Sequence, residues 1–206
     1  MTWDFKKNLA ESVDESARNM AASCLRQYFA RAPGLVIDFS PGEVPYQQDI
    51  DVTAFGERYK VEQKHRPRRD WGDELLEDIS NDQTGRQGWT WRASSVDYVL
   101  YTYPTSGRWT IFPGPALEAA WRKNRDRWVS AFGTRHAPNR GYFTVNVPVP
   151  TSQLKHALAE CGAPLCSVCQ RNVGRFGATC AVCKERNCCA ISDGEWMCAR
   201  CAEPVS

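Results

Sequence analysis

Long apolar runs are missing from this chain, and so is the apolar segment of a signal peptide. No run in the 206 residues approaches the roughly 18 consecutive apolar residues that a membrane-spanning helix needs. The opening segment, MTWDFKKNLAESVDESARNM, has no apolar core of the kind that a secretory signal requires. We therefore expect a cytoplasmic protein with no membrane partner.

Charge of one sign is also scarce, because the formal net charge is only +2 at pH 7. This near balance argues against a polycationic coating for nucleic acid, although a local basic patch can still bind phosphate. Hydrophobic residues make up 42% of the chain, as in a globular protein. Length and composition together predict one main core with a small appendage.

Cysteine is rare before residue 160 and abundant after it. Cys24 and Cys161 are isolated, whereas the other eight of the ten cysteines are clustered near the C-terminus. In a reducing cytosol such clusters are metal ligands more often than disulfides. Large aliphatic side chains also become scarce there, so we expect a main domain at residues 1–160 and a cysteine-rich domain at residues 161–206.

The cysteine-rich domain repeats the spacing of zinc ligands. Two cysteines separated by two residues present both sulfurs to one tetrahedral ion, and eight thiolates are enough for two Zn²⁺. A segment with so few aliphatic side chains would take its folding energy from metal binding. Redox-active or unpaired thiols are the alternative. The expected zinc ligands are Cys166, Cys169, Cys180, Cys183, Cys188, Cys189, Cys198 and Cys201.

Hydrophobic periodicity predicts a mixed α/β core in the main domain. The last of its strands contains two prolines, so we expect that strand at the edge of a sheet. In chain order the expected elements are a helix over residues 9–29, a strand over 34–39, a hairpin over 49–65, a helix from near Asp73, strands over 96–103 and 108–112, a helix over 114–132 and a strand over 142–150.

The hairpin segment DIDVTAFGERYKVEQKH carries an unusual set of charges. A two-residue turn at residues 56–57 would place Asp51 opposite Glu62 and Asp49 opposite Lys64. Because side chains alternate along a strand, these four would share one face of the hairpin. The other face would carry mostly apolar side chains.

Carboxylates that face each other across two strands repel, and a divalent cation between them removes the repulsion. Mg²⁺ or Mn²⁺ prefers such hard oxygen ligands, so Asp51 and Glu62 are candidate ligands. Lys64 could then orient an attacking water or neutralise the charge that develops on a phosphate. The alternative is a solvated hairpin whose acids and bases pair harmlessly across the strands.

An acid-bearing helix, then Asp51, a turn and Glu62-x-Lys64, resembles the PD-(D/E)xK nuclease superfamily, which includes many restriction endonucleases and Holliday-junction resolvases. The resemblance in element order spans roughly residues 9–150. It implies a restriction-endonuclease-like mixed sheet flanked by helices, with a small cysteine-rich zinc-binding module after it.

The same resemblance implies roles for single residues. Asp51 and Glu62 match the metal ligands of the superfamily, and Lys64 matches its catalytic lysine. No proline precedes the aspartate here, and Asp49 could serve in place of Asp51. The superfamily often adds a glutamate from the first helix, for which we select Glu15, with Glu11 and Asp14 as alternatives.

A basic segment follows the hairpin and is expected to bind DNA phosphates, which gives affinity without sequence information. The alternative is a solvated loop. Tryptophans after it could stack on an exposed base, although burial is the commoner role. The candidate phosphate ligands are His65, Arg66, Arg68 and Arg69; the tryptophans are Trp71, Trp89 and Trp91, with Trp109, Trp121 and Trp128 assigned to the core.

The cysteine pairs, with GRFGATCAVCK in the middle and WMCARC at the end, resemble cross-brace fingers of the FYVE and rabphilin kind. In those fingers the first and third pairs share one ion, and the second and fourth pairs share the other. The third pair departs from that pattern because Cys188 and Cys189 are adjacent; Cys161 could substitute, or the first four could form a simple ribbon.

Together these features predict a metal-dependent endonuclease that hydrolyses DNA phosphodiester bonds with a metal-activated water. Its zinc module would position it on DNA or on a protein partner. The alternative is a catalytically silent adaptor that uses a nuclease-like fold to bind nucleic acid or protein.

Overall fold

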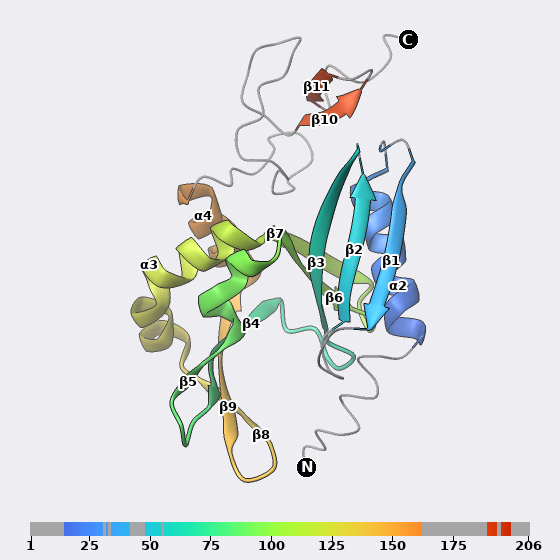
Figure 1. Ribbon diagram of the computed structural model, residues 1–206. Coiled ribbons are helices and arrows are strands. Elements are labelled where there is room, and N and C mark those ends of the chain that lie inside the picture. The colour runs from blue at the N-terminus through green and yellow to red at the C-terminus, as the bar shows by residue number, and fades with distance from the viewer. Residues whose placement is uncertain are drawn as a thin grey trace.

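The computed structural model describes residues 15–30, 32, 34–41, 48–54, 56–161, 189–192 and 195–198. These residues form two main sheets with helices packed on them, so the predicted mixed α/β class is confirmed (Figure 1). Sheet A has five strands in the order β1-β2-β3-β6-β7, and sheet B has four strands in the order β5-β4-β9-β8.

The helices are α2 (Glu15–Tyr28), the 3-10 helix η1 (Trp89–Ser95), α3 (Gly114–Phe132) and α4 (Thr151–Glu160). The strands of sheet A are β1 (Val36–Pro41), β2 (Gln48–Ala54), β3 (Glu57–His65), β6 (Tyr98–Tyr103) and β7 (Arg108–Pro113). Those of sheet B are β4 (Asp73–Asn81), β5 (Arg86–Gln87), β8 (Arg135–Pro138) and β9 (Phe143–Pro150). None of these helices within the described residues is both long and apolar enough to span a membrane.

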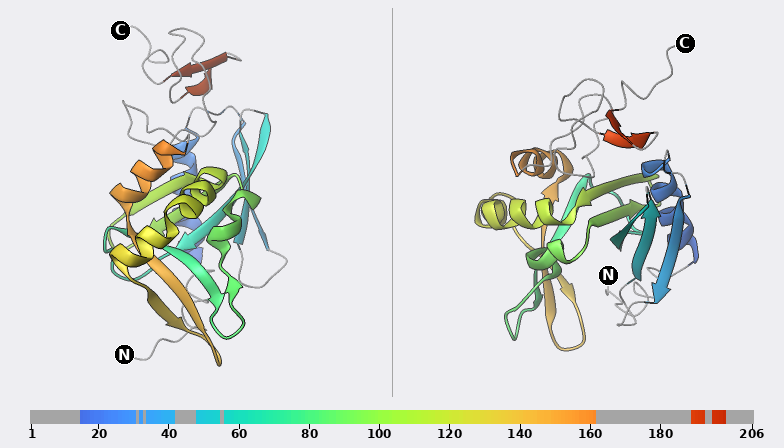
Figure 2. Two further views of the ribbon diagram at one scale, coloured as in Figure 1. Left: turned by 90° about the vertical axis from the view of Figure 1, so that its left-hand side faces the viewer. Right: turned by 45° about the horizontal axis from the view of Figure 1, so that its top comes forward.

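Sheet A consists of an antiparallel meander of three strands, a crossover and a final hairpin. Strands β1, β2 and β3 pair antiparallel in sequence order, β6 then pairs parallel to β3, and β7 returns antiparallel to β6. One face of this sheet is covered by α2, where Leu25 packs with Ile50, Val52 and Val61 (Figures 1 and 2). The predicted apolar face of the hairpin is therefore confirmed.

The other face of sheet A packs against α3, α4 and sheet B. Val99 and Phe112 of sheet A join Leu117 and Trp121 of α3 and Val147 of β9 in one buried cluster. Sheet A thus lies between α2 on one side and the layer of α3, α4 and sheet B on the other (Figure 2). The core assignment of Trp121 and Trp128 is confirmed, whereas Trp109 is only partly buried.

The helix expected from near Asp73 is wrong, because these residues form strand β4, which pairs with β9. The acids of DELLEDIS suggest a solvated helix, yet several of them are buried against arginines from other elements. Glu74 contacts Arg108, and Asp78 contacts Arg125. Partners remote in the chain therefore neutralise this segment and permit an extended strand.

The edge position expected for residues 142–150 is also wrong, because β9 lies between β4 and β8. Strand β8 pairs only with residues 143–146 of β9. Pro148 and Pro150 lie beyond that range, where β9 pairs with β4 alone. A proline lacks the amide hydrogen that a second neighbour would need, so both prolines occupy the half of the strand that is free on one side.

The cysteine-rich segment contributes one described hairpin, β10 (Cys189–Ser192) and β11 (Glu195–Cys198), which pair antiparallel. Its register places the backbone of Cys189 opposite that of Cys198. The other expected zinc ligands, namely Cys166, Cys169, Cys180, Cys183, Cys188 and Cys201, lie outside the described residues. The zinc assignment stays a prediction.

Candidate active site

The hairpin of β2 and β3 turns one residue earlier than the sequence suggests. Ala54 pairs with Glu57, so the turn lies between these two residues. Gly56 occupies the second turn position with φ 75°, a left-handed conformation that suits glycine in tight hairpins. Residue 57, which was expected in the turn, is the first residue of β3.

This register corrects the predicted pairing of the acids by two residues. Asp49 lies opposite Glu62, and Asp51 lies opposite Lys60. The two partners of a directly opposed antiparallel pair share one face of a sheet. The position of Asp49, rather than that of Asp51, is therefore the neighbour of Glu62.

Asp51 has a different contact. Its Oδ2 accepts a hydrogen bond of 2.7 Å from Nη2 of Arg58, an exposed side chain beside the turn. This hydrogen bond, aided by the charges of Arg58 and Lys60, holds the pKa of the Asp51 carboxyl below its usual value. Asp51 thus takes part in an ion pair near the turn, two residues along β2 from the register partner of Glu62.

Glu62 and Lys64 lie side by side on β3 and contact each other. Lys64 Nζ donates to Glu62 Oε1 at 2.5 Å, and Glu62 is only 7% exposed. Their register partners on β6 are Val99 and Tyr101, which belong to the core shared with α3. The predicted common face of Glu62 and Lys64 therefore points toward the layer that contains sheet B and η1.

Two further residues complete this environment: Trp89, for which base stacking or burial was expected, and Glu77, which had no predicted role. The ammonium of Lys64 lies 4.2 Å from the centroid of the Trp89 ring. The backbone N–H of Trp89 donates to Oε1 of Glu77 at 3.2 Å. Gly88 permits this approach of η1 to β4, because a Cβ at residue 88 would lie 2.1 Å from the carbonyl oxygen of Glu77.

Electrostatic coupling joins Glu77 to the pair on β3. Burial raises the pKa of Glu77, the positive charge of Lys64 opposes that rise, and the negative charge of Glu62 adds to it. One cation and two carboxylates thus interact in a partly buried space between β3, β4 and η1. A carboxylate pair of this kind supplies the hard oxygen ligands that Mg²⁺ and Mn²⁺ prefer.

Among the side chains that the structure describes, no group of three or more His, Cys, Asp or Glu residues is arranged to hold a metal ion. Glu15 is exposed at the first residue of α2. Helix α2 covers the face of sheet A opposite to Glu62, and its Ala17 carbonyl accepts a hydrogen bond from Nε2 of Gln63 at 3.0 Å. The structure therefore brings Glu62, Lys64 and Glu77 together but leaves Glu15 on the other side of the sheet.

The basic segment after β3 divides into a structural part and an exposed part. Arg66 is largely buried, and its Nη1 contacts Asp73 Oδ1 at 2.8 Å, so its guanidinium has a structural contact instead of an open position for phosphate. The Nδ1 atom of His65 lies 2.9 Å from Oγ1 of Thr102. Arg68 and Arg69 are exposed.

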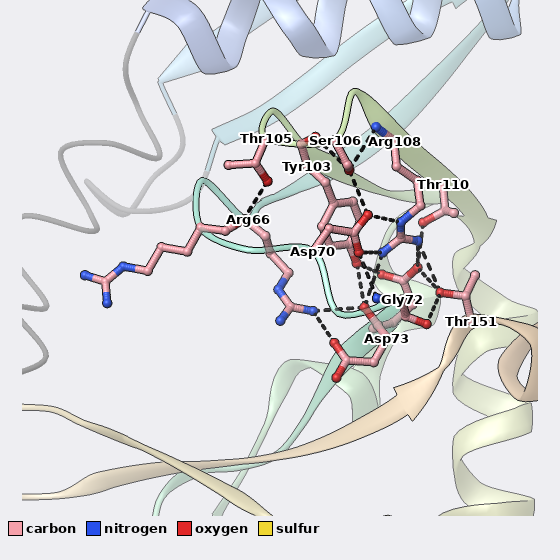
Figure 3. A network of polar contacts seen from close by, with 12 residues as sticks. Arg66, Asp70, Gly72, Asp73, Tyr103, Thr105, Ser106, Arg108, Thr110 and Thr151 are labelled. Atoms are coloured by element: carbon pink, nitrogen blue, oxygen red, sulfur yellow. Dashed lines mark hydrogen bonds and ion pairs between the residues drawn. The ribbon is translucent and has the colours of Figure 1, made fainter. Parts of the chain in front are cut away.

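A second polar network, centred on Arg108, lies next to this segment (Figure 3). The guanidinium of Arg108 contacts both oxygens of Asp70, at 2.7 and 2.8 Å, and Oε1 of Glu74 at 2.9 Å. Glu74 is fully buried and also accepts hydrogen bonds from the hydroxyls of Tyr103 and Thr110. The network ties the loop before β4 to β7, and we assign it a structural role.

The Asp70 carboxylate of this network makes the unfolding free energy depend on pH in the acid range. Its contacts to Arg108 hold the pKa of Asp70 far below the value of about 3.9 that an unfolded chain has. A lowered carboxyl pKa stabilises the fold at pH above about 4, and this contribution is lost as the pH falls through the folded-state pKa.

We therefore expect the difference in unfolding free energy between wild type and Asp70→Asn to stay constant from about pH 5 to 7 and to shrink below about pH 4. Urea unfolding at a series of pH values measures it. Glu74, whose pKa burial raises, is present in both proteins, so its titration largely cancels from the difference. A difference that is the same at every pH would contradict the assignment.

Comparison with known proteins gives no match: no protein-family model fits the chain, and no curated protein or solved structure is significantly similar to it.

Proposed function

We propose that the protein is a metal-dependent DNA endonuclease whose active centre is formed by Glu62 and Lys64 of β3, Glu77 of β4 and the Asp49 position of β2. One observation carries the proposal: the buried Glu62 contacts Lys64 at 2.5 Å, and its register partner on β2 is Asp49. The order of an α-helix, three antiparallel strands and a fourth strand parallel to the third supports it, since this order resembles the PD-(D/E)xK core.

The residues fit a divalent cation, because carboxylate oxygens of Glu62 and Asp49 are ligands of the kind that Mg²⁺ takes. The bound metal would supply a Lewis acid and lower the pKa of a coordinated water. Lys64 would orient that water and stabilise the charge that develops on the scissile phosphate. Its contact with Glu62 holds the ammonium in place before substrate binds.

The connection between β3 and β6 differs from the connection that the sequence suggests. A covering helix was expected there, and β4, β5 and η1 are found instead. Glu77 and Trp89 come from this crossover and lie next to Lys64. We propose that Glu77 assists in holding the metal or its water, while Trp89 fixes the ammonium of Lys64.

The cysteine-rich segment extends this proposal. We propose that it holds two structural Zn²⁺ ions through the cysteines at 166, 169, 180, 183, 188, 189, 198 and 201. Its role would be to position the nuclease on DNA or on a protein partner.

The register of β2 and β3 gives the sharpest test of the site. Purified protein is incubated with supercoiled, linear and branched DNA in the presence of Mg²⁺, Mn²⁺ or a chelator. Wild type is expected to cut only with metal present. Asp49→Asn is expected to lower the cleavage rate by at least about 100-fold through loss of a metal ligand, whereas Asp51→Asn retains cleavage within a few-fold.

The two aspartates are two residues apart on one strand, so each variant is a matched control for the other. If Asp51→Asn loses cleavage and Asp49→Asn retains it, the assignment of Asp49 is wrong. If wild type cuts no substrate under any condition yet binds DNA, the nuclease proposal fails and the non-catalytic adaptor replaces it.

A further inference from the structure

Trp71 is unusual among the large hydrophobic side chains that the structure describes, because 58% of its surface is exposed. It lies in the loop between β3 and β4, and its ring does not belong to either buried cluster. Burial of such a ring would stabilise the protein, and here the ring instead keeps much of its surface available to a ligand.

Two arginines from different parts of the chain lie close to this ring. The guanidinium carbon of Arg69 is 4.4 Å from the ring centroid, and that of Arg135, on β8, is 5.9 Å away. Both arginines are exposed. Arg135 also contacts Asp73 at 3.2 Å, and Asp73 in turn contacts Arg66, so the cation from β8 is fixed beside the loop.

The loop backbone is held on both sides of Trp71. Before it, the Arg68 carbonyl accepts a hydrogen bond of 3.0 Å from Oγ1 of Thr105. After it, the N–H of Gly72 donates to Asp70 at 2.9 Å, and the Gly72 carbonyl accepts from the N–H of Thr151 at 3.0 Å. Because the loop is already ordered, little conformational entropy of the loop is lost when a ligand binds to the ring.

We infer that Trp71, with Arg69 and Arg135, forms a binding site for an unpaired base of single-stranded DNA and its adjacent phosphates. A base would stack on the ring or on the guanidinium plane of Arg69, which lies over the ring, and the arginines would neutralise the adjacent phosphates. A continuous duplex does not offer the face of a base, because its bases are stacked on one another. The inference rests on the proposed nuclease function and gives that function a substrate class: DNA with an unpaired strand.

The position of the site relative to the proposed active centre agrees with one strand contacting both. Asp73, which binds Arg135, and Glu77 are four residues apart on β4. Four residues of extended strand span about 13 Å. A single strand of a few nucleotides that stacks on Trp71 can therefore reach the Glu62 and Lys64 pair.

The test measures DNA binding without cleavage. Fluorescence anisotropy in a chelating buffer compares a labelled oligothymidine with a labelled duplex for wild type, Trp71→Ala, Trp71→Phe and Phe143→Ala. Phe143 is the matched control, because its ring is 45% exposed on β9. We expect Trp71→Ala to weaken single-strand binding by roughly 10-fold, and Trp71→Phe and Phe143→Ala to stay within about threefold of wild type.

Duplex binding should change by less than about twofold in Trp71→Ala, since duplex affinity depends on phosphate contacts. For single strands, a plot of log affinity against log salt concentration has a negative slope. Arg69→Ala should make this slope less steep by about 0.7, the value of one phosphate contact. Equal weakening of single-strand and duplex binding by Trp71→Ala, or equal loss in Phe143→Ala, would overturn the inference. Failure of wild type to bind single strands would overturn it too, and the cleavage test with metal on duplex DNA remains independent of that result.

Discussion

Replacing Lys64 by alanine is expected to lower metal-dependent DNA cleavage by about a thousand-fold or more. A positioned proton donor or acceptor contributes roughly 10²–10⁴-fold, and removal of a charge-stabilising donor costs a similar factor. The ammonium of Lys64 is held by Glu62 at 2.5 Å and by the Trp89 ring at 4.2 Å, and a water in its place would not carry its positive charge. Initial cleavage rates at saturating Mg²⁺ measure the effect.

The matched control is Lys60→Ala on the same strand. Lys60 is exposed and lies opposite Asp51, so its removal is expected to change the rate by only a few-fold. Removing Lys64 alone leaves the Glu62 carboxylate without its partner, which can lower stability. The double variant Glu62→Gln, Lys64→Met removes both charges and, with a wild-type thermal unfolding curve, would separate loss of catalysis from loss of fold.

The roles of Glu62 and Lys64 also differ in a measurable way. Glu62→Gln should weaken Mn²⁺ binding, because an amide is a poorer ligand for a hard cation than a carboxylate. Lys64→Ala should retain Mn²⁺ binding while it loses cleavage. Cleavage by Lys64→Ala at the wild-type rate would remove the lysine from the proposed mechanism.

Arg108→Ala is expected to lower the unfolding free energy by about 3–5 kcal/mol, the cost of leaving a buried partner charge unpaired. Glu74 is 0% exposed and would lose the guanidinium that neutralises it, and Asp70 would lose both of its short contacts. Urea unfolding at neutral pH measures the change. Arg108→Lys should recover only part of it, because an ammonium cannot reproduce the planar fork of contacts.

Arg122→Ala is the matched control for this prediction. Arg122 is 54% exposed, pairs with Glu118 one helical turn away on α3 and donates to the Trp91 carbonyl at 2.8 Å, so its loss is expected to cost at most about 1.5 kcal/mol. Similar losses in the two variants would contradict a special role of the Arg108 network.

The hairpin illustrates what alternation alone can predict. It assigns Ile50, Val52 and Val61 to the core and Glu62 to the opposite face, and the structure agrees. Moving the turn by one residue shifts the pairing by two, which leaves every side chain on its original face. Faces therefore follow from the sequence even when the turn is misplaced, whereas the identity of the opposed pair does not.

Glu77 and the Arg108 network could not be predicted in the same way. The acids of β4 look solvated in the sequence because their partners, Arg66, Arg108 and Arg125, belong to other elements. A local pattern contains no signal for such contacts. Only the pairing of β4 with β9 turns a helix-like acidic segment into a strand that carries Glu77 to Lys64.

The long crossover between β3 and β6 has a dynamic consequence. Glu62 and Lys64 belong to sheet A, but their cover belongs to β4 and η1, which β9 and α3 hold in place. Segments tied by remote contacts can open as a unit while the rest of a domain stays folded. In hydrogen exchange the amides of β4 and β9 would then exchange together, as one cooperative unit. A substitution that weakens β9 would then loosen the segments packed beside Lys64 without contacting the lysine itself.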